Sequence, residues 1–273
     1  MWKLIKMDFY RLLSSKTFKV GAILAAIMSV LYIFFSLGIM ALTKFALGTD
    51  PTLAANLGTL LSQAGWMNGV DFAEIVFRGT SALTLFVGCM IASSFIGSEQ
   101  SCGYVKNFAG QLPNKGYMAV SKFVVTSFAQ FMILFIYTGV CSALAFPVFG
   151  KYITGYDLKS LFWALGLRLM LHLAINAIII FVCALAKSHA IAMVAGCVLG
   201  LGITEVAYTV VSLVLRVVNI KFFVSDYMPD GINSQLSLSS LGDLSLKAIF
   251  VSIGFMIVFL IANYYVLSKR DVK

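Results

Sequence analysis

The sequence predicts an all-α integral membrane protein with six transmembrane helices. Of its 273 residues, 60% are hydrophobic and only 11% are charged, whereas a soluble domain carries about 25% charged residues. The mean hydropathy is +0.96. The apolar residues fall in continuous runs of about 20, which is the length that crosses a bilayer core. These runs lack the alternation of apolar and polar residues that strands of a membrane barrel show.

We expect one transmembrane domain over residues 1–273, with six spans. The spans are predicted at residues 20–43, 81–97, 123–150, 161–186, 190–215 and 248–267. The fifth has an alternative, because Gly200 and Gly202 precede Glu205 and a helix can break at such glycines. Residues 206–218 then form a short re-entrant helix instead of the end of a continuous span.

Residues 1–18 predict an amphipathic helix that lies in the headgroup layer of the membrane. At 100° per residue, apolar side chains gather on one arc and basic or polar ones on the other. The apolar arc holds Trp2, Ile5, Phe9, Leu12 and Leu13, and the polar arc holds Lys3, Lys6, Tyr10, Arg11 and Ser14. The simpler alternative is a basic flank of the first span.

The distribution of charge predicts that both termini are cytoplasmic. With the N-terminus inside, the inner segments are rich in Lys and Arg and contain only Asp8, Glu99 and Asp271 as acids. The outer segments balance acids and bases, so the net charge of +9 falls on the inner side. The basic excess therefore indicates orientation and anionic lipid, and it does not indicate nucleic acid.

Two segments outside the spans are long. The inner segment 99–122 is longer than the usual connection of about 2–8 residues between helices, which favours a docking surface. The outer segments, 44–80 and 216–247, are rich in aromatic residues that we expect to anchor at the membrane interface. These aromatic residues include Phe72, Phe77, Phe223 and Tyr227.

The inner segment carries a pattern of spaced residues. An acidic residue ends the second span, and a Gly, a Lys-Asn pair, a Pro-polar-basic step and a Ser-Lys opening of the third span follow. The matching positions are Glu99, Gly103, Lys106, Asn107, Pro113, Lys115, Ser121 and Lys122. In this pattern, and over nearly its full length, the chain resembles the permease subunit of bacterial type-2 ATP-binding-cassette exporters of the small peptide or bacteriocin export and immunity kind.

The resemblance implies a fold, a site and partners. It implies that residues 99–122 form the coupling segment gripped by a cytoplasmic P-loop ATPase, which binds ATP and Mg²⁺. It also implies a second permease copy, identical or a sister chain, and a bacterial cytoplasmic membrane. The substrate class it favours is an amphipathic or antimicrobial peptide, or another hydrophobic molecule. The chain has no GxxxxGK[ST] loop of its own, so we expect a transport subunit with no catalytic residues and no directly bound cofactor.

Polar residues inside the predicted spans form a second candidate site. Arg168, His172 and Asn176 are spaced four apart on one helix face, with Glu205 on the fifth span and Gln130 on the third. Counting 1.5 Å per residue puts Arg168 at about 12 Å and Glu205 at about 16 Å from the outer ends, so the two could pair. They either line a transport path or form a gating ion pair, or they act as structural contacts between spans four and five.

Two other functional classes remain as alternatives. An ion-coupled secondary transporter typically shows inverted repeats and broken helices, and no internal repeat is evident. An intramembrane enzyme needs converging catalytic groups, but the sequence has no GxSG or HExxH motif. His172 and His189 are its two histidines, with no second ligand at a spacing that predicts a metal site.

Overall fold

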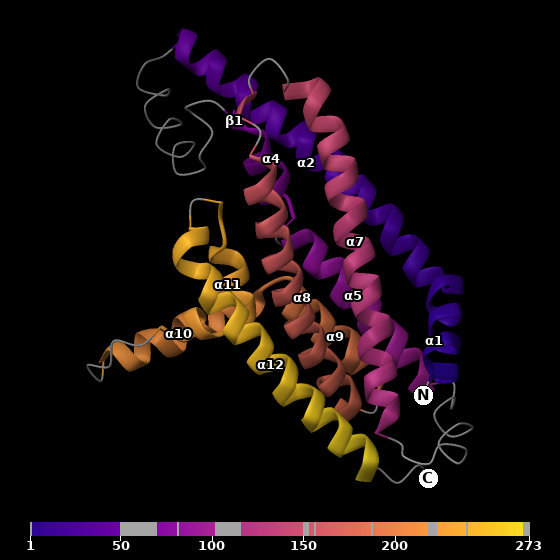
Figure 1. The fold of residues 1–273 in the computed structure, drawn as a ribbon. Coiled ribbons are helices and arrows are strands. Elements are labelled where there is room, and N and C mark those ends of the chain that lie inside the picture. Colours follow the sequence, from indigo (N-terminus) through magenta and orange to yellow (C-terminus); the bar gives the residue numbers. More distant parts are fainter. Residues whose placement is uncertain are drawn as a thin grey trace.

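The computed structural model describes residues 2–49, 70–80, 82–101, 116–149, 153–155, 157–186, 188–217, 223–238 and 240–269, and nearly all of them are helical (Figure 1). The long helices are α2 (Lys16–Thr49), α5 (Ala82–Ser101), α7 (Tyr117–Phe149), α8 (Leu158–Ala186) and α12 (Leu241–Lys269). The shorter ones are α1 (Trp2–Ser14), α4 (Phe72–Arg78), α9 (His189–Gly200), α10 (Ile203–Val217), the 3₁₀ helix η1 (Val224–Tyr227) and α11 (Pro229–Gln235). Strands β1 (Val70–Asp71) and β2 (Ile153–Gly155) pair in parallel.

Five helical stretches in the described residues are long and apolar enough to cross a membrane. They are Lys16–Gly38, Phe72–Glu99, Tyr117–Phe149, Leu158–Ala186 and Leu244–Lys269. This confirms the predicted class, a helical multi-pass membrane protein. A sixth crossing exists only if α9 and α10 count as one span, and these two helices are bent by 66° at the break between them.

Helices α2 and α12 turn apolar faces away from the bundle. On α2, Val20, Ile23, Ile27 and Leu31 recur at helical spacing and are all at least half exposed. On α12, Leu246, Phe250, Ile257 and Ile261 form a similar exposed stripe. In a bilayer such faces meet acyl chains, so their exposure does not conflict with the hydrophobic effect.

Helix α5 packs closely against α9 through small residues. A Cβ atom at Gly196 would overlap Ser93 of α5, and one at Gly200 would meet the backbone of Phe86. At the other end of the contact, a Cβ atom at Gly97 would overlap His189. Small residues allow helix backbones to approach one another in membranes, and α9 therefore runs antiparallel along α5.

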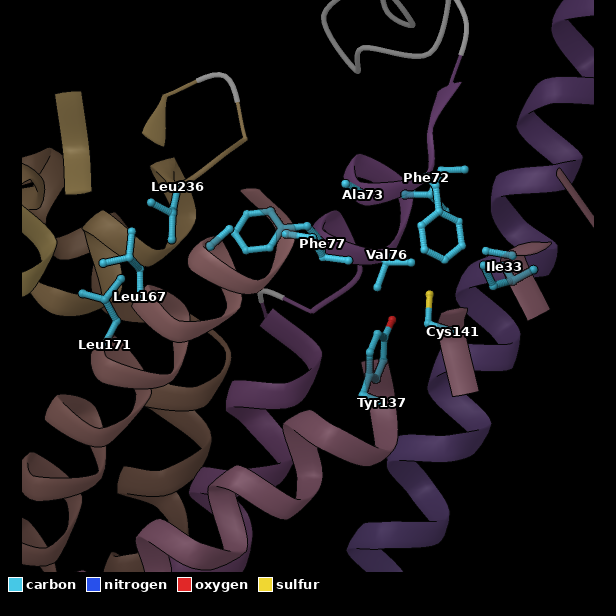
Figure 2. Close-up of a cluster of buried hydrophobic side chains, with 14 of the residues drawn as sticks. Ile33, Phe72, Ala73, Val76, Phe77, Tyr137, Cys141, Leu167, Leu171 and Leu236 are labelled. Carbon is cyan, nitrogen blue, oxygen red and sulfur yellow. The ribbon is translucent and has the colours of Figure 1, made fainter. Parts of the chain in front are cut away.

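Helix α4 lies inside the bundle, which corrects the prediction for residues 44–80. Phe72 and Phe77 were expected at the membrane interface, but they are 8% and 0% exposed and belong to the apolar core shown in Figure 2. Their neighbours there include Ile33 of α2, Tyr137 of α7 and Leu167 of α8. The apolar helical stretch that contains the predicted second span, 81–97, thus begins earlier, at Phe72, with the separate short helix α4.

The segment after α9 also differs from the prediction. The predicted span 190–215 is interrupted at Leu201 and Gly202, where Gly202 has a φ of +70°, a conformation that glycine adopts at little cost. Figure 1 shows α10 leaving the side of the bundle, so residues 206–217 belong to a separate helix. The chain then returns through α11, in which Asp230, Ile232 and Asn233 are buried within the bundle.

Both ends of the described chain lie at one end of the bundle. Leu4 of α1 packs in a cluster with Met118 and Ala119 of α7, Ala184 of α8 and Leu267 of α12. We call this the termini-bearing end. Helix α1 packs mainly against α7, while Trp2 and Tyr10 remain 78% and 77% exposed.

Candidate functional site

A buried charge network joins three helices at the termini-bearing end. Glu99, near the end of α5, forms ion pairs with Arg11 of α1 and Lys122 of α7. Asp8 of α1 accepts a hydrogen bond from the Ser121 hydroxyl at 2.6 Å and lies 3.9 Å from the Arg11 guanidinium. Two acids and two bases thus offset one another away from water, as buried charges require.

The network is well shielded from solvent. Glu99, Asp8 and Lys122 are 2%, 2% and 5% exposed, and the Arg11 guanidinium lies 4.2 Å from the centre of the Phe95 ring. Burial raises the pKa of Asp8 above its ordinary value of 3.8, and the hydrogen bond from Ser121 offsets part of that shift. The N-terminal helix is therefore fixed to α5 and α7 by specific contacts as well as by its apolar face.

The structure brings together the two ends of the predicted coupling segment. Glu99 and Lys122 bound residues 99–122 in the sequence and are paired directly. The other residues that were predicted to contact an ATPase lie outside the described residues. These are Gly103, Lys106, Asn107, Pro113 and Lys115.

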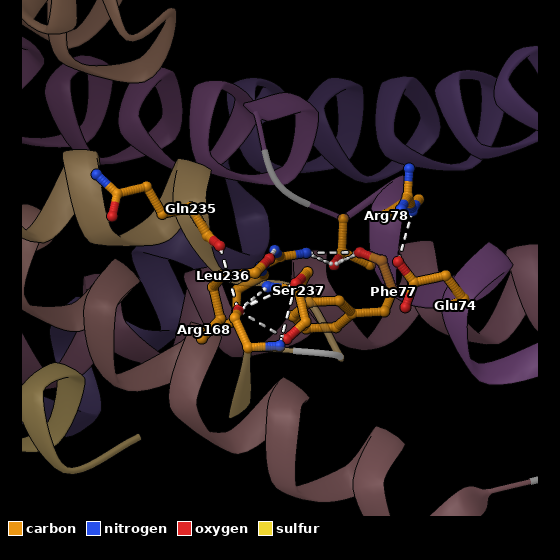
Figure 3. Close-up of polar contacts among 9 residues, drawn as sticks. Glu74, Phe77, Arg78, Arg168, Gln235, Leu236 and Ser237 are labelled. Carbon is orange, nitrogen blue, oxygen red and sulfur yellow. Dashed lines mark hydrogen bonds and ion pairs between the residues drawn. The ribbon is translucent and has the colours of Figure 1, made fainter. Parts of the chain in front are cut away.

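Arg168 lies at the ends of two short helices (Figure 3). Its Nη1 donates to the carbonyl oxygen of Phe77 at 2.5 Å and to the Thr80 hydroxyl, both at the break between α4 and α5. Its Nη2 donates to the carbonyl oxygen of Leu236, the residue that ends α11, at 3.2 Å. The guanidinium also lies 3.7 Å from the centre of the Phe77 ring.

These contacts explain how the bundle holds a cation that is 1% exposed. The C-terminus of a helix carries unpaired carbonyl groups and a partial negative charge, and Arg168 meets two such ends. Arginine suits this role because its guanidinium presents a fixed fork of donors. The side chain thereby links α8 to both α4 and α11.

A pair between Arg168 and Glu205 does not form. Within the described ranges, no carboxylate lies within ion-pair distance of Arg168, and Glu205 lies in the first turn of α10 beside the break after α9. The depth estimate for Glu205 assumed a continuous fifth span. The bend at Gly202 invalidates that assumption.

The rest of the polar stripe on α8 pairs with α7. The Gln130 amide nitrogen donates to Nδ1 of His172 at 2.8 Å and lies 3.3 Å from the carbonyl oxygen of Thr84. The Asn176 amide donates to the Thr126 hydroxyl at 2.9 Å. Because Nδ1 of His172 accepts, its Nε2 carries the proton of the neutral ring. These bonds join spans three and four, whereas the structural interpretation of the sequence placed the contacts of this stripe between spans four and five.

An apolar groove of about 630 Å³ lies between α7 and α8 and reaches α4. Phe131, Phe135 and Phe162 form part of its wall. Two glycines, Gly139 and Gly166, also line it, and a Cβ atom at either would meet nothing within 4 Å. The groove can therefore hold a flexible apolar chain such as the acyl chain of a lipid.

Several residues of these networks were not singled out from the sequence. Arg11 and Asp8 were treated as part of a helix facing headgroups, and Asp230 and Asn233 as part of an outer segment. One signal was available for Asp8, because it is an acid within an otherwise basic inner segment. No comparable signal marks Asn233, whose burial follows from the return of α11 into the bundle.

The described side chains include no group of three or more His, Cys, Asp or Glu residues placed to hold a metal ion. The fold and the networks thus define a helical multi-pass membrane protein with buried charges at two levels. A comparison with models of protein families finds no match. A search of curated proteins also finds no match.

Proposed function

We propose that the chain is the membrane-spanning permease subunit of an ATP-driven exporter in the bacterial cytoplasmic membrane. The proposal starts from the resemblance of residues 99–122 to the coupling segment of type-2 exporter permeases. The observation that carries it is the contact of Glu99 with both Lys122 and Arg11. This contact ties the two ends of the segment to each other and to the N-terminal helix.

The contact gives the coupling segment a mechanical role. A segment fixed at both ends to α5 and α7 cannot move without moving these helices. Closure of two ATPase subunits on ATP and Mg²⁺ would push on the segment of each permease copy. Two permease copies would then alternate between inward-open and outward-open arrangements, and the permease itself would perform no bond chemistry.

The substrate class follows from the family and agrees with the chemistry of the groove. We expect an amphipathic or antimicrobial peptide, or another hydrophobic molecule, taken from the cytoplasm or the inner leaflet. The apolar groove between α7 and α8 offers such a molecule an apolar surface, in which the exposed side chains of Phe135 and Phe162 take part.

Co-purification tests the proposal. The tagged chain, expressed from its native operon and extracted in mild detergent, should elute with a stoichiometric P-loop ATPase identified by mass spectrometry. Lys106→Glu together with Lys115→Glu should abolish co-elution, whereas Lys247→Glu, on α12 outside the coupling segment, should preserve it. Recovery of the chain without any ATPase would refute the proposal.

The ion-coupled transporter is the second candidate, and one observation favours it. Helices α9 and α10 are bent by 66° within what would be a single span, and broken helices carry the ion sites of many secondary transporters. Substrate uptake by proteoliposomes would identify that class if it continues without ATP and stops when the ion gradient across the membrane is dissipated.

A further inference from the structure

The apolar groove between α7 and α8 has the length of one leaflet of a bilayer. Its wall runs from Phe131 to Ser142 on α7 and from Leu158 to Leu169 on α8. At about 1.5 Å per residue each stretch is about 16 Å long, and half of a hydrocarbon core is about 15 Å. Leu158 is the first residue of α8, so the groove begins at the end of the bundle that lies away from the termini-bearing end.

The wall of the groove offers no free hydrogen-bond donor to a polar occupant. Among the described residues that line it, Thr138 and Ser142 are the two with polar side chains. Their hydroxyls donate to the carbonyl oxygens of Leu134 and Gly139 at 2.8 and 3.0 Å. An ordered internal water needs about two to four polar partners, which this wall does not supply. The chemistry of the wall therefore selects hydrocarbon.

Two glycines leave space that no described side chain fills. Gly139 and Gly166 line the groove, and a Cβ atom at either would meet nothing within 4 Å. A gap of this kind forfeits dispersion contacts until an occupant enters it. Because α7 and α8 are in contact, a helix of a second copy, about 10–12 Å across, is too wide to enter between them. An acyl chain is slender enough, and the exposed rings of Phe135 and Phe162 extend the apolar surface around it.

A cation lies where the groove begins. Lys159 follows Leu158 in the first turn of α8 and is exposed. The neighbouring carboxylate of Asp157 accepts hydrogen bonds from the amide and the hydroxyl of Ser160, so it caps the helix. Lys159 forms no ion pair with any described residue. Its ammonium group is therefore placed to meet a phosphate at the level of the lipid headgroups.

We propose that this groove binds a phospholipid from the leaflet away from the termini-bearing end. One acyl chain lies along the groove past Gly139 and Gly166, and the phosphate lies beside Lys159. The inference goes beyond the exporter proposal, because lipid binding here needs no ATPase and either proposal can fail without the other. A hydrophobic substrate that entered the same groove would displace this lipid.

Photocrosslinking of the purified full-length chain in dodecyl maltoside tests the site. The probe is a phosphatidylglycerol that carries a diazirine in the middle of one acyl chain, and mass spectrometry locates the label. Labelling of the groove should saturate as the probe is added, and unlabelled phosphatidylglycerol should compete with it. The exposed face of α2 at Ile23 and Ile27 should be labelled in proportion to the probe, without saturation, because it meets only the micelle.

Glycine variants locate the acyl chain. Gly166→Leu should abolish saturable labelling of the groove, because the leucine side chain occupies the gap; Gly139→Leu is a second, separate variant with the same expected result. The control is Gly254→Leu on α12, where an exposed glycine also has nothing within 4 Å of an added Cβ atom; it should keep the wild-type labelling. The proposal is overturned if wild-type labelling of the groove fails to saturate, or if both groove variants are labelled as Gly254→Leu is.

A lysine variant locates the headgroup. Lys159→Met should raise the half-saturating concentration of the probe about five-fold, the effect of one basic residue beside an anionic lipid. Lys247→Met, on α12 outside the groove, should leave that concentration unchanged. Equal half-saturating concentrations in the two variants would overturn the contact between Lys159 and the phosphate.

Discussion

Replacement of Arg168 tests whether two helix ends are held by one side chain. Arg168→Leu removes hydrogen bonds to the Phe77 carbonyl, the Thr80 hydroxyl and the Leu236 carbonyl. Hydrogen bonds from a charged group contribute about 1.5–3 kcal/mol each, so the gross loss is about 4–9 kcal/mol. The cation–π contact with Phe77 contributes about 2 kcal/mol more.

The net effect is smaller, because a leucine also removes a desolvated charge. Relief of that desolvation returns several kcal/mol, and we expect a net destabilisation of about 3–5 kcal/mol. Arg168→Lys retains the charge but replaces the two terminal donor nitrogens, Nη1 and Nη2, with the single ammonium nitrogen of lysine. Since Nη1 serves α4 and Nη2 serves α11, a lysine can reach only one helix end. We expect it to lose about half as much stability as the leucine variant.

The assay combines a global and a local measurement. The apparent midpoint of thermal unfolding in detergent reports the whole bundle. Maleimide labelling of Cys141, located by mass spectrometry, reports the core beside α4, because this thiol is 0% exposed and packs in the same cluster as Phe72. Faster labelling of Cys141 should accompany the lower midpoint in both Arg168 variants.

The control is another arginine on the same chain. Arg216 is exposed and lies 5.0 Å from the centre of the Phe223 ring, so Arg216→Leu should cost no more than about 1 kcal/mol. An Arg168→Lys variant with wild-type stability and wild-type labelling of Cys141 would show that charge alone matters. The link between α4 and α11 through the guanidinium would then be refuted.

Three further predictions concern the charge network at the termini-bearing end and the packing at two glycines. In a double-mutant cycle, Glu99→Gln and Lys122→Met should together cost about 1–3 kcal/mol less than the sum of the single changes, as measured by unfolding midpoints; additivity would contradict the ion pair. Asp8→Asn should stabilise the protein most at neutral pH. Burial raises the pKa of Asp8 in the folded state, so the wild-type protein loses stability as the pH rises above 3.8 and this carboxyl group ionises. Its advantage over the wild type should shrink as pH falls toward 3.8, and a pH-independent difference would refute the assignment. Gly166→Leu should leave the midpoint unchanged because it projects into an open groove, whereas Gly88→Ala should cost about 1–3 kcal/mol because its Cβ would overlap the Gln130 amide; equal effects would contradict the packing.

The membrane class was predictable from the sequence because it depends on local composition. Runs of apolar residues report the solvent of a helix directly, and the helices α7 and α8 cover the predicted third and fourth spans. The polar stripe through His172 and Asn176 was also predictable, since a spacing of four residues places side chains on one face. The hydrogen-bond partners of this stripe on α7 could not be predicted, because they depend on how α7 and α8 are aligned.

The partner of Arg168 could not be predicted for a physical reason. A sequence displays side chains, so Glu205 was the evident counter-ion, whereas the groups that hold Arg168 are backbone carbonyls of Phe77 and Leu236. Those carbonyls face Arg168 because α4 and α11 end there after seven residues each, and the Phe77 carbonyl also accepts hydrogen bonds from the N–H and the hydroxyl of Thr80. Helices of that length are too short to be detected as spans in a hydropathy profile.

Helix α5 connects the two levels of buried charge. Glu99 near one end belongs to the network with Arg11 and Lys122, and Thr80, just before the other end, belongs to the contacts of Arg168. The helix is 20 residues long, about 30 Å, and its close glycine contacts with α9 resist bending. A displacement imposed at Glu99 would therefore reach the Arg168 contacts as movement of a rigid helix. Coupling of this kind needs an element with two positions, and a second position of α5 would require this helix to shift relative to α4, which ends at Arg78.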